Sequence, residues 1–292
     1  MPGIHSLPMW DCAGVKLLHY ALQQGLRPVA MAEFWWGAPP REGVRHHGQV
    51  YPACRGRCQP ILPFMLRGIA VEPEALPGAP QHGPALRPTL YEDEDLLVVN
   101  KPCGLLSVPG KAVQDSVLTR LRQRYPRSSG PLLVHRLDLA TSGLLLAAKN
   151  AETHKALQQQ FERRQVEKRY LAVLSKRLPE GEDSGSIELP LRVDLDDRPR
   201  QVVCPTYGRP AKTHWQVIAR EAATTRVYFY PLTGRTHQLR MHAAHRDGLD
   251  APIAGDALYA NGGERLLLHA ERICFTHPRT GERIEVEAPA PF

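Results

Sequence analysis

Short strand patterns follow one another through the last two hundred residues, with helical patterns inserted among them. The strand patterns are apolar or alternating runs at residues 96–100, 144–148, 168–174, 211–220 and 225–232, with a closing hairpin at 272–276 and 283–286. The helical patterns lie at residues 116–125, 152–164 and 235–245. Because strands and helices do not strictly alternate, we expect an α+β domain with a mixed, mostly antiparallel sheet and flanking helices.

A proline-rich stretch divides the chain. Residues 71–88 contain Pro73, Pro77, Pro80, Pro84 and Pro88. Such a segment is extended and forms no regular element, so it is predicted to be a connector. It separates an N-terminal extension of unknown role, residues 1–70, from a main domain at residues 89–292. Apolar residues make up 42% of the chain, which is enough for a substantial core.

The charge balance is moderately basic. Lys and Arg total 37 against 30 acidic residues, a net charge of +7. This excess suits contact with a polyanion over part of the surface, although many proteins without that function share it. The densest basic stretch is Arg163, Arg164, Lys168 and Arg169. It reads equally well as a solvated helix end and as a surface facing nucleic acid.

Compartment signals point to the cytoplasm. No apolar run approaches the length of about 20 residues that spans a bilayer, so no membrane partner is expected. The N-terminus lacks the layout of a signal peptide. Six cysteines are spread thinly along the chain, which is not the pattern of a disulfide framework and favours a reducing environment.

Residues 134–143 form a polar loop that leads into an apolar strand. Asp138 lies in this loop among hydroxyl side chains and backbone amides. A carboxylate held in such a place suits a nucleophile. The alternative is a loop aspartate that bonds its own backbone in an Asx-turn. The residues alone leave both interpretations open.

Residues 231–242 predict a strand that turns sharply into a helix. Gly234 would allow the turn, and Arg235 would then lie in the first helical turn, where the dipole disfavours a cation. A residue in that position often has an anionic partner, either a carboxylate or a phosphate. Arg240 and His242 lie farther along, and we expect them on the surface or facing RNA.

The strand at 168–174 opens with basic and aromatic side chains. Lys168 and Tyr170 should point to one side of the sheet and Arg169 to the other. A basic side chain beside an aromatic ring can neutralise a phosphate and stack a base. The same composition is also common in strands without that role.

Taken together, these segments resemble the RluA-type pseudouridine synthase family over about residues 89–292. The motifs, in the family's order, are NKPCGLLSVPG (100–110), HRLDLATSG (135–143), KRYLA (168–172), PLTGRTHQLRMH (231–242), PIAGDALY (252–259) and RLLLHA (265–270). The pairing of HRLD…SG with TGRTHQLR is highly specific. The resemblance implies a pseudouridine synthase fold with a central RNA-binding cleft, in which Lys101, Pro102 and Gly104 are structural.

The resemblance also assigns roles to single residues. Asp138 matches the catalytic aspartate and Arg235 the arginine paired with it. Tyr170 matches the tyrosine that packs on the uracil ring. Arg136 matches the arginine that fills the RNA stack when the target base leaves it. Leu267 matches an apolar residue of the pocket wall.

The implied function is isomerisation of uridine to pseudouridine in structured RNA, with 23S ribosomal RNA and transfer RNA as expected substrates. Lys168, Arg169 and Arg240 are expected to bind RNA. The reaction needs no cofactor, and a monomer is expected. One alternative is a catalytically silent RNA-binding module on the same fold. Another is a hydrolase, which would need a second carboxylate such as Glu167 or Asp256.

The N-terminal region contains two weaker signals. His46, His47, Cys54 and Cys58 could supply four zinc ligands, but their compact spacing matches no defined zinc finger, and a structural role is favoured. The Trp35–Trp36 pair could stack on RNA, although core packing is the preferred interpretation.

Overall fold

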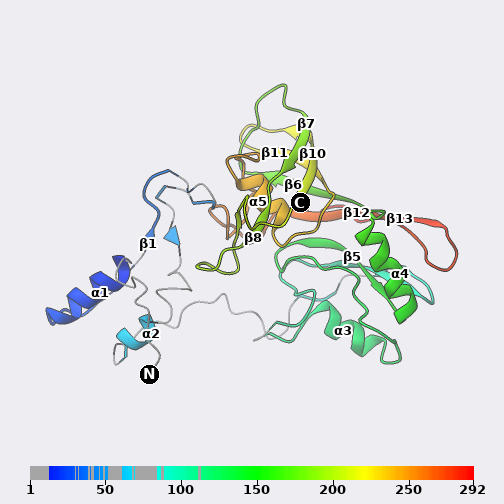
Figure 1. Ribbon diagram of the computed structural model, residues 1–292, viewed down its shortest axis with the longest axis horizontal. Helices are drawn as coiled ribbons and strands as arrows, with labels where there is room; N and C mark the ends of the chain where they lie inside the picture. Colours follow the sequence, from blue (N-terminus) through cyan, green and yellow to red (C-terminus); the bar gives the residue numbers. More distant parts are fainter. Residues whose placement is uncertain are drawn as a thin grey trace. The chain divides into compact units, whose positions relative to one another are not determined.

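A computed structural model of the chain divides into two compact units (Figure 1). It describes residues 13–29, 31, 33–38, 40, 43–45, 47–48, 50–51, 61–67, 69, 84–86, 89–110 and 113–292. One unit combines Met1–Ala75 with Arg192–Val203, and the other combines Leu76–Leu191 with Cys204–Phe292. We call the second one the catalytic unit, after the activity that the sequence resemblance implies for residues 89–292. No helix in the described part of the chain is long and apolar enough to cross a membrane.

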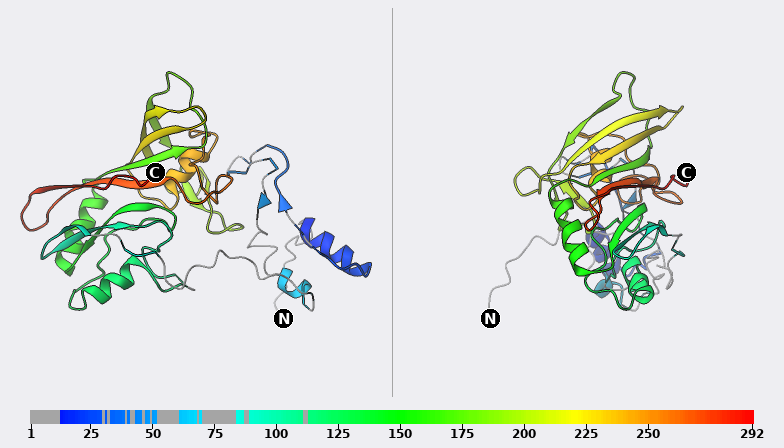
Figure 2. Two further views of the ribbon diagram at one scale, coloured as in Figure 1. Left: turned by 180° about the vertical axis from the view of Figure 1, so that it is seen from behind. Right: turned by 90° about the vertical axis from the view of Figure 1, so that its right-hand side faces the viewer.

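A nine-stranded sheet is the frame of the catalytic unit. The strand order is β3-β4-β5-β12-β6-β11-β10-β7, and β13 pairs with β12. The strands are β3 (Thr89–Glu92), β4 (Leu96–Lys101), β5 (Ser142–Ala148), β6 (Glu167–Leu174), β7 (Ser184–Glu188), β10 (Lys212–Arg220), β11 (Thr225–Pro231), β12 (Leu268–Thr276) and β13 (Arg283–Glu287). The β12–β13 hairpin is the long red ribbon in Figure 2. The expected α+β class with a mostly antiparallel sheet is confirmed.

The parallel contact within this sheet lies between β5 and β12. His269 pairs with Ser142 and Ala270 with Gly143. Gly143 has φ +116°, and a Cβ there would lie 2.3 Å from the Ala270 carbonyl oxygen. A glycine is therefore required where these two strands meet.

Two helices cover opposite faces of the β4–β5 part of the sheet. Alternate residues of β4 belong to different cores, with Leu96 and Val98 on one side and Leu97 and Val99 on the other. The first core includes Leu157 of α4 (Ala151–Glu162), and the second includes Val117 and Leu121 of α3 (Val117–Arg124). Burial on both faces explains why these strands are continuous apolar runs.

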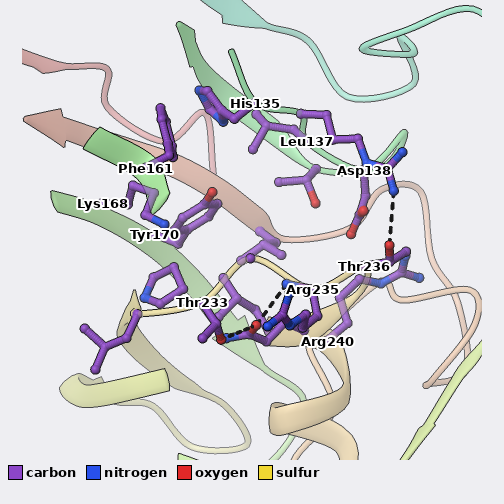
Figure 3. A pocket seen from close by; sticks show the side chains of 18 of the residues that line it. His135, Leu137, Asp138, Phe161, Lys168, Tyr170, Thr233, Arg235, Thr236 and Arg240 are labelled. Carbon is purple, nitrogen blue, oxygen red and sulfur yellow. Dashed lines mark hydrogen bonds between the residues drawn. The ribbon is translucent and has the colours of Figure 1, made fainter. Parts of the chain in front are cut away.

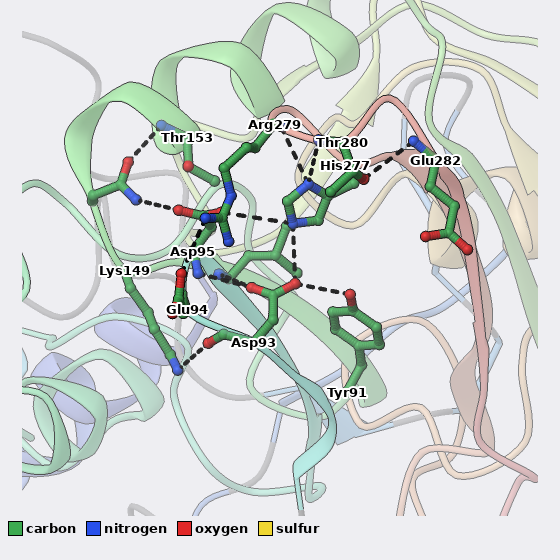
Figure 4. A network of polar contacts seen from close by, with 12 residues as sticks. Tyr91, Asp93, Glu94, Asp95, Lys149, Thr153, His277, Arg279, Thr280 and Glu282 are labelled. Atoms are coloured by element: carbon green, nitrogen blue, oxygen red, sulfur yellow. Dashed lines mark hydrogen bonds and ion pairs between the residues drawn. The ribbon is translucent and has the colours of Figure 1, made fainter.

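A polar network joins the β3–β4 turn to the β12–β13 hairpin (Figure 4). Asp93 Oδ2 accepts a hydrogen bond from the Tyr91 hydroxyl at 2.8 Å and contacts Nε2 of buried His277 at 3.0 Å. Arg279 Nε lies 2.6 Å from Asp95 Oδ2. These contacts fix the hairpin against the sheet edge.

The segment after β11 departs from the expectation in one respect. Helix α5 (Gln238–Ala244) begins three residues later than the pattern 235–245 predicts. The left-handed residue is His237, with φ 53°, whereas Gly234 lies outside that conformation and a Cβ there would meet nothing within 4 Å. The sharp turn therefore occurs at His237, and Arg235 lies in the loop before the helix.

The first unit contains α1 (Ala13–Gln23), α2 (Leu62–Met65), and strands β1 (Glu33–Phe34) and β2 (Val50–Tyr51), which form their own small sheet. An ion pair between Arg45 and Asp197 links its N-terminal part to the inserted segment. That segment includes most of a second hairpin, β8 (Leu191–Val193) with β9 (Gln201–Val203). Its inclusion could not be foreseen from the linear division at residue 70.

Of the four residues in the zinc hypothesis, the structure describes His47, whereas His46, Cys54 and Cys58 lie outside the described residues. The ring of His47 lies 4.5 Å from that of Trp36, and its Nδ1 accepts a hydrogen bond from the Gly37 amide at 3.0 Å. Trp36 is 77% exposed, so the preferred interpretation of core packing is wrong for this residue.

Candidate functional site

A pocket of about 400 Å³ opens on the catalytic unit where five segments converge. These segments are the loop before β5, the end of α4, the start of β6, the turn from β11 into the first residues of α5, and the start of β12. The lining side chains used below are those of His135, Arg136, Asp138, Phe161, Lys168, Tyr170, Arg235, Thr236, Arg240 and Leu268. Figure 3 shows Asp138 and Tyr170 on one side, with Thr233, Arg235, Thr236 and Arg240 across from them.

The loop that carries Asp138 is held from both sides of that residue. The Ser107 hydroxyl accepts from the Leu137 amide at 3.0 Å and donates to the Leu137 carbonyl at 2.7 Å. The Lys101 ammonium donates to the Leu139 carbonyl at 3.1 Å. The Thr141 amide donates to the Asp138 carbonyl at 3.1 Å. The backbone around Asp138 is therefore fixed without use of its carboxylate.

The Asp138 carboxylate is half-buried and faces the pocket. Within the described part of the chain it makes no side-chain hydrogen bond and no ion pair, which argues against the Asx-turn alternative. Its negative charge acts to raise the pKa of three groups, Lys101, Tyr170 and Arg240, although burial lowers the pKa of Lys101 by more. The carboxylate thus lies near two cations, Lys101 and Arg240, and forms an ion pair with neither.

Lys101 is fully buried beneath this loop. Its Nζ also donates to the carbonyls of Pro102 and Leu105, at 3.0 and 2.8 Å. Burial lowers the pKa of Lys101 to about 8, although the charges of Cys103 and Asp138 act in the opposite direction. The resemblance treats this residue as structural. Its amine also provides a positive charge behind the carboxylate.

Arg240 is the second cation near Asp138. It is 4% exposed, and its Nε and Nη2 donate to Asp256 at 2.7 and 2.5 Å. Burial alone would lower the pKa of Arg240, but the hydrogen bond and charge of Asp256, together with the charges of Tyr259 and Asp138, raise it above its usual value. The surface position expected for Arg240 and His242 is therefore wrong, since both side chains are buried.

Arg235 lines the same pocket but is not paired with Asp138. Its Nε donates to the Pro210 carbonyl at 3.0 Å, and among the described residues it has no carboxylate partner. Burial lowers the pKa of Arg235, and the charges of Arg209 and Arg164 lower it further. The ion pair inferred for Arg235 is therefore absent, because α5 begins late and leaves this residue at the pocket edge.

Tyr170 and Lys168 project from β6 into the pocket, as their spacing predicts. Burial raises the pKa of the Tyr170 hydroxyl well above its usual value, and the charge of Asp138 raises it further. Burial lowers the pKa of Lys168 to about 8. The Lys168 amine lies 5.7 Å from the centre of the Phe161 ring, which in turn stacks on His135 at 4.8 Å.

Two further expectations need correction. Arg169 points to the other face of β6, as predicted, but it ion-pairs there with Glu271 and Glu287, both at 3.0 Å, and does not line the pocket. Leu267 does not line the pocket either. Leu268 takes that place, because consecutive residues of a strand face opposite sides.

Arg136 is exposed at the pocket mouth. Its Nη2 donates to the Thr236 hydroxyl at 3.2 Å, which is the dashed line beside Asp138 in Figure 3. This contact joins the loop before β5 to the loop before α5. It is a single hydrogen bond at an exposed site, where water competes for both groups, so an entering ligand can replace it at small cost.

Sequence reasoning missed several residues of the site. His135 accepts a hydrogen bond from the Leu146 amide at 3.0 Å, and burial together with the charge of Lys168 lowers its pKa to about 3. Leu268 lies in the RLLLHA motif, one position after the residue to which the resemblance pointed. His135 stands within the HRLD motif and could have been found there.

The chain was compared with known proteins. Residues 95–245 match the family model described as RNA pseudouridylate synthase. Two similar curated proteins are both named dual-specificity RNA pseudouridine synthase RluA. The one from Yersinia pestis is 42% identical over 211 residues, covering 70% of this chain and 98% of the relative. The one from Escherichia coli K12 is 43% identical over 211 residues, covering 70% and 93%.

Two solved structures are also similar. Human RNA pseudouridylate synthase domain containing 1 has a TM-score of 0.57 and 29% identity, and the match covers 71% of this chain and 84% of that one. Human RNA pseudouridylate synthase domain containing 4 has a TM-score of 0.55 and 25% identity, with coverage of 70% and 88%.

Proposed function

We propose that Asp138 is the nucleophile with which this chain, which belongs to the RNA pseudouridylate synthase family, converts uridine in RNA to pseudouridine. The observation that carries the proposal is the half-buried Asp138 carboxylate, which faces the pocket and has no side-chain partner in the described part of the chain. A carboxylate on a rigid loop with open oxygen atoms can attack a bound nucleoside.

The reaction exchanges one glycosidic bond for another. The bond from the ribose to N1 of uracil breaks, the base turns within the pocket, and C5 bonds to the ribose. C5 loses its proton to solvent and N1 gains a proton, so no electrons enter or leave. The chemistry therefore requires no cofactor. Asp138 forms a temporary covalent bond to the nucleoside, and this bond breaks again before the product leaves.

Two buried cations support the carboxylate in this proposal. The charge of Asp138 acts on both Lys101 and Arg240, and neither cation forms a hydrogen bond or an ion pair with its oxygens. A half-buried carboxylate needs positive charge near it, because burying an isolated charge is costly. Arg240 thereby takes the role that the sequence resemblance implied for Arg235.

The remaining pocket residues would receive a uracil base. A base inside an RNA helix must first leave the stack, which costs a few kcal/mol. We assign Tyr170 to stacking on the base, Arg136 to filling the gap it leaves, and Leu268 to the apolar wall. Because burial and the charge of Asp138 raise the pKa of Tyr170, its hydroxyl stays protonated and can hydrogen-bond the base.

The substrate we propose is structured RNA, either 23S ribosomal RNA, transfer RNA or both. The name of the curated relatives, dual-specificity RNA pseudouridine synthase, supports two RNA substrates. We expect the chain to act as a monomer in the cytoplasm. Among the described residues, Cys103 and Cys274 are free thiols, which suits a reducing compartment.

The hydrolase alternative loses its two candidate acids. Glu167 lies 2.6 Å from Arg283, and Asp256 is fully buried against Arg240. Neither lines the pocket. The silent-module alternative is disfavoured because Asp138, Tyr170 and Arg240 all line one pocket, and Lys101 lies beneath the loop that carries Asp138.

One experiment separates these functions. Unmodified ribosomal and transfer RNA transcripts are incubated with the wild type and with Asp138→Ala, and their nucleosides are analysed. We expect pseudouridine with the wild type alone, while Asp138→Ala still binds RNA. Free uracil would indicate a hydrolase, and binding without product by the wild type would indicate a silent module. Normal turnover by Asp138→Ala would overturn the assignment of the nucleophile.

A further inference from the structure

Three arginines without an acidic partner among the described residues come from loops next to the pocket. Arg164 follows α4, Arg209 precedes β10, and Arg235 follows β11, so they come from three separate loops. Arg164 and Arg209 are exposed, and Arg235 is half-buried. Among the described residues, none of the three forms an ion pair.

Two contacts bring these loops together. Arg235 Nε donates to the carbonyl of Pro210, the residue next to Arg209, at 3.0 Å. Phe161 and Glu162, at the end of α4, line the same pocket as Arg235. The backbone then turns through the left-handed conformation at Arg164, with φ 59°, before β6 begins. Arg235 thus lines the pocket, and Arg209 and Arg164 come from the two loops next to it.

Their charges are close enough to repel one another. After burial, the positive charges of Arg209 and Arg164 are what lower the pKa of Arg235. By contrast, Arg169 of β6 and Arg272 of β12 do have acidic partners. Arg169 lies 3.0 Å from Glu271, and Arg272 forms a hydrogen bond of 2.7 Å to Glu285. Like charges without acids cost stability, so an arrangement of this kind indicates an external anion.

We infer that Arg164, Arg209 and Arg235 bind successive phosphates of the RNA strand that carries the target uridine, and we call them the arginine clamp. This inference rests on the proposed function. A guanidinium presents a planar fork that matches phosphate oxygens, and it stays charged. An RNA strand whose nucleotide enters the pocket must pass this edge with its phosphates. The clamp would set the position of the strand without reading its sequence.

The clamp residues should act on binding rather than on stability. Arg164 and Arg209 are exposed and hold no partner in the described part of the chain, so removing either charge leaves no group unsatisfied. It also relieves repulsion at Arg235. We therefore expect Arg164→Gln and Arg209→Gln to unfold at the wild-type temperature or slightly above it.

The test measures the affinity for an RNA hairpin with uridines in its loop, at several salt concentrations. The logarithm of the association constant K falls as log salt rises, and each lost phosphate contact should make this slope shallower by about 0.7–0.9. At about 0.1 M salt this corresponds to a fivefold to tenfold weaker affinity for Arg164→Gln and for Arg209→Gln. Arg209→Lys keeps the charge and should keep most of the slope.

The matched control is Arg122→Gln. Arg122 is also exposed and without an ion pair among the described residues, but it lies on α3, which does not line the pocket. It should bind RNA with the wild-type slope. If Arg164→Gln and Arg209→Gln both keep that slope too, the arginine clamp is wrong.

Pseudouridine formation is measured on the same hairpin and on the transcripts, and it keeps the two proposals apart. If the wild type makes pseudouridine while the clamp variants bind normally, the clamp fails and the proposed function stands. If the slope falls as expected but Asp138→Ala remains active, the clamp stands and the nucleophile is wrong. Clamp variants should raise KM more than they lower kcat.

Discussion

Two aspartates of the catalytic unit differ in what surrounds them, and this difference assigns their roles. Asp256 is fully buried, is bonded to Arg240, and accepts the amides of Leu258 and Tyr259 at 2.8 and 3.0 Å. Asp138 faces the pocket with its oxygens unengaged in the described structure. A carboxylate with every lone pair in use is structural, whereas an open one can react.

Arg240 is expected to matter for both folding and turnover. Arg240→Gln leaves Asp256 buried without its ion-pair partner, which should lower the free energy of unfolding by about 3–5 kcal/mol. The double variant Arg240→Gln/Asp256→Asn replaces the pair with neutral amides and should recover most of that loss in denaturant titrations. Its turnover should stay low, because the charge near Asp138 is still missing. Recovery of both would show that Arg240 is only structural.

Lys168 should reduce stability at neutral pH while helping RNA binding. Its pKa of about 8 in the folded chain lies below the unfolded value of 10.5. The unfolded state therefore binds more protons between about pH 8 and pH 10.5, so this group makes the chain more stable as the pH rises through that window.

Lys168→Met removes this titration. At pH 7 the variant should be more stable than the wild type by about 3 kcal/mol, and the gap should close by about pH 10.5. Thermal unfolding at several pH values measures it. RNA affinity should fall. A gap that is constant with pH would contradict the burial of this charge.

At the scale of elements, the site depends on how closely β5 approaches β12. The loop with Asp138 leads into β5, and Leu268, at the start of β12, lines the pocket. Their parallel pairing at Gly143 and Ala270 fixes the distance between these two walls. The approach is possible because residue 143 has no side chain.

Gly143→Ala should therefore be severely destabilising. Its Cβ would overlap the Ala270 backbone, and the residue would be strained at φ +116°. We expect a loss of about 3–5 kcal/mol in the free energy of unfolding. Gly234→Ala is the matched control, since its Cβ meets nothing within 4 Å and its φ is ordinary, and its unfolding should be unchanged. Equal behaviour of the two variants would refute this explanation.

Local patterns predicted the elements well where burial dictates the sequence. The apolar runs of β4 and β5 and the capped helices α3 and α4 appear within one or two residues of expectation. The start of α5 was missed because a left-handed His237 has no sequence signal. The motifs identified Asp138 and Tyr170. They could not separate Arg235 from Arg240, because only the helix start decides which guanidinium lies near the carboxylate.

At the scale of the molecule, the three buried apolar clusters found in the described part of the chain all belong to the catalytic unit. The first unit is supported instead by small elements and by the Arg45–Asp197 ion pair. We propose that residues 1–70 are an extension, that residues 71–88 connect it, and that residues 89–292 carry the activity.

A chain that begins at residue 84 should keep the fold and the activity of the catalytic unit. Hydrogen exchange should show unchanged protection in β5 and β12. Protection should fall in residues 192–203, because Asp197 loses Arg45 and the buried Val202 loses the other part of its unit. Loss of protection throughout the sheet would show that the extension is needed for folding.

The central claim is that the Asp138 carboxylate performs the isomerisation. The reaction releases the hydrogen at C5 of uracil, so RNA with tritium at that position reports turnover directly. With enzyme in excess over RNA, the wild type should release tritium to water. Asp138→Asn, which keeps the shape of the side chain, should bind the RNA with similar affinity and release none. Tritium release by Asp138→Asn at a rate near that of the wild type would contradict the account.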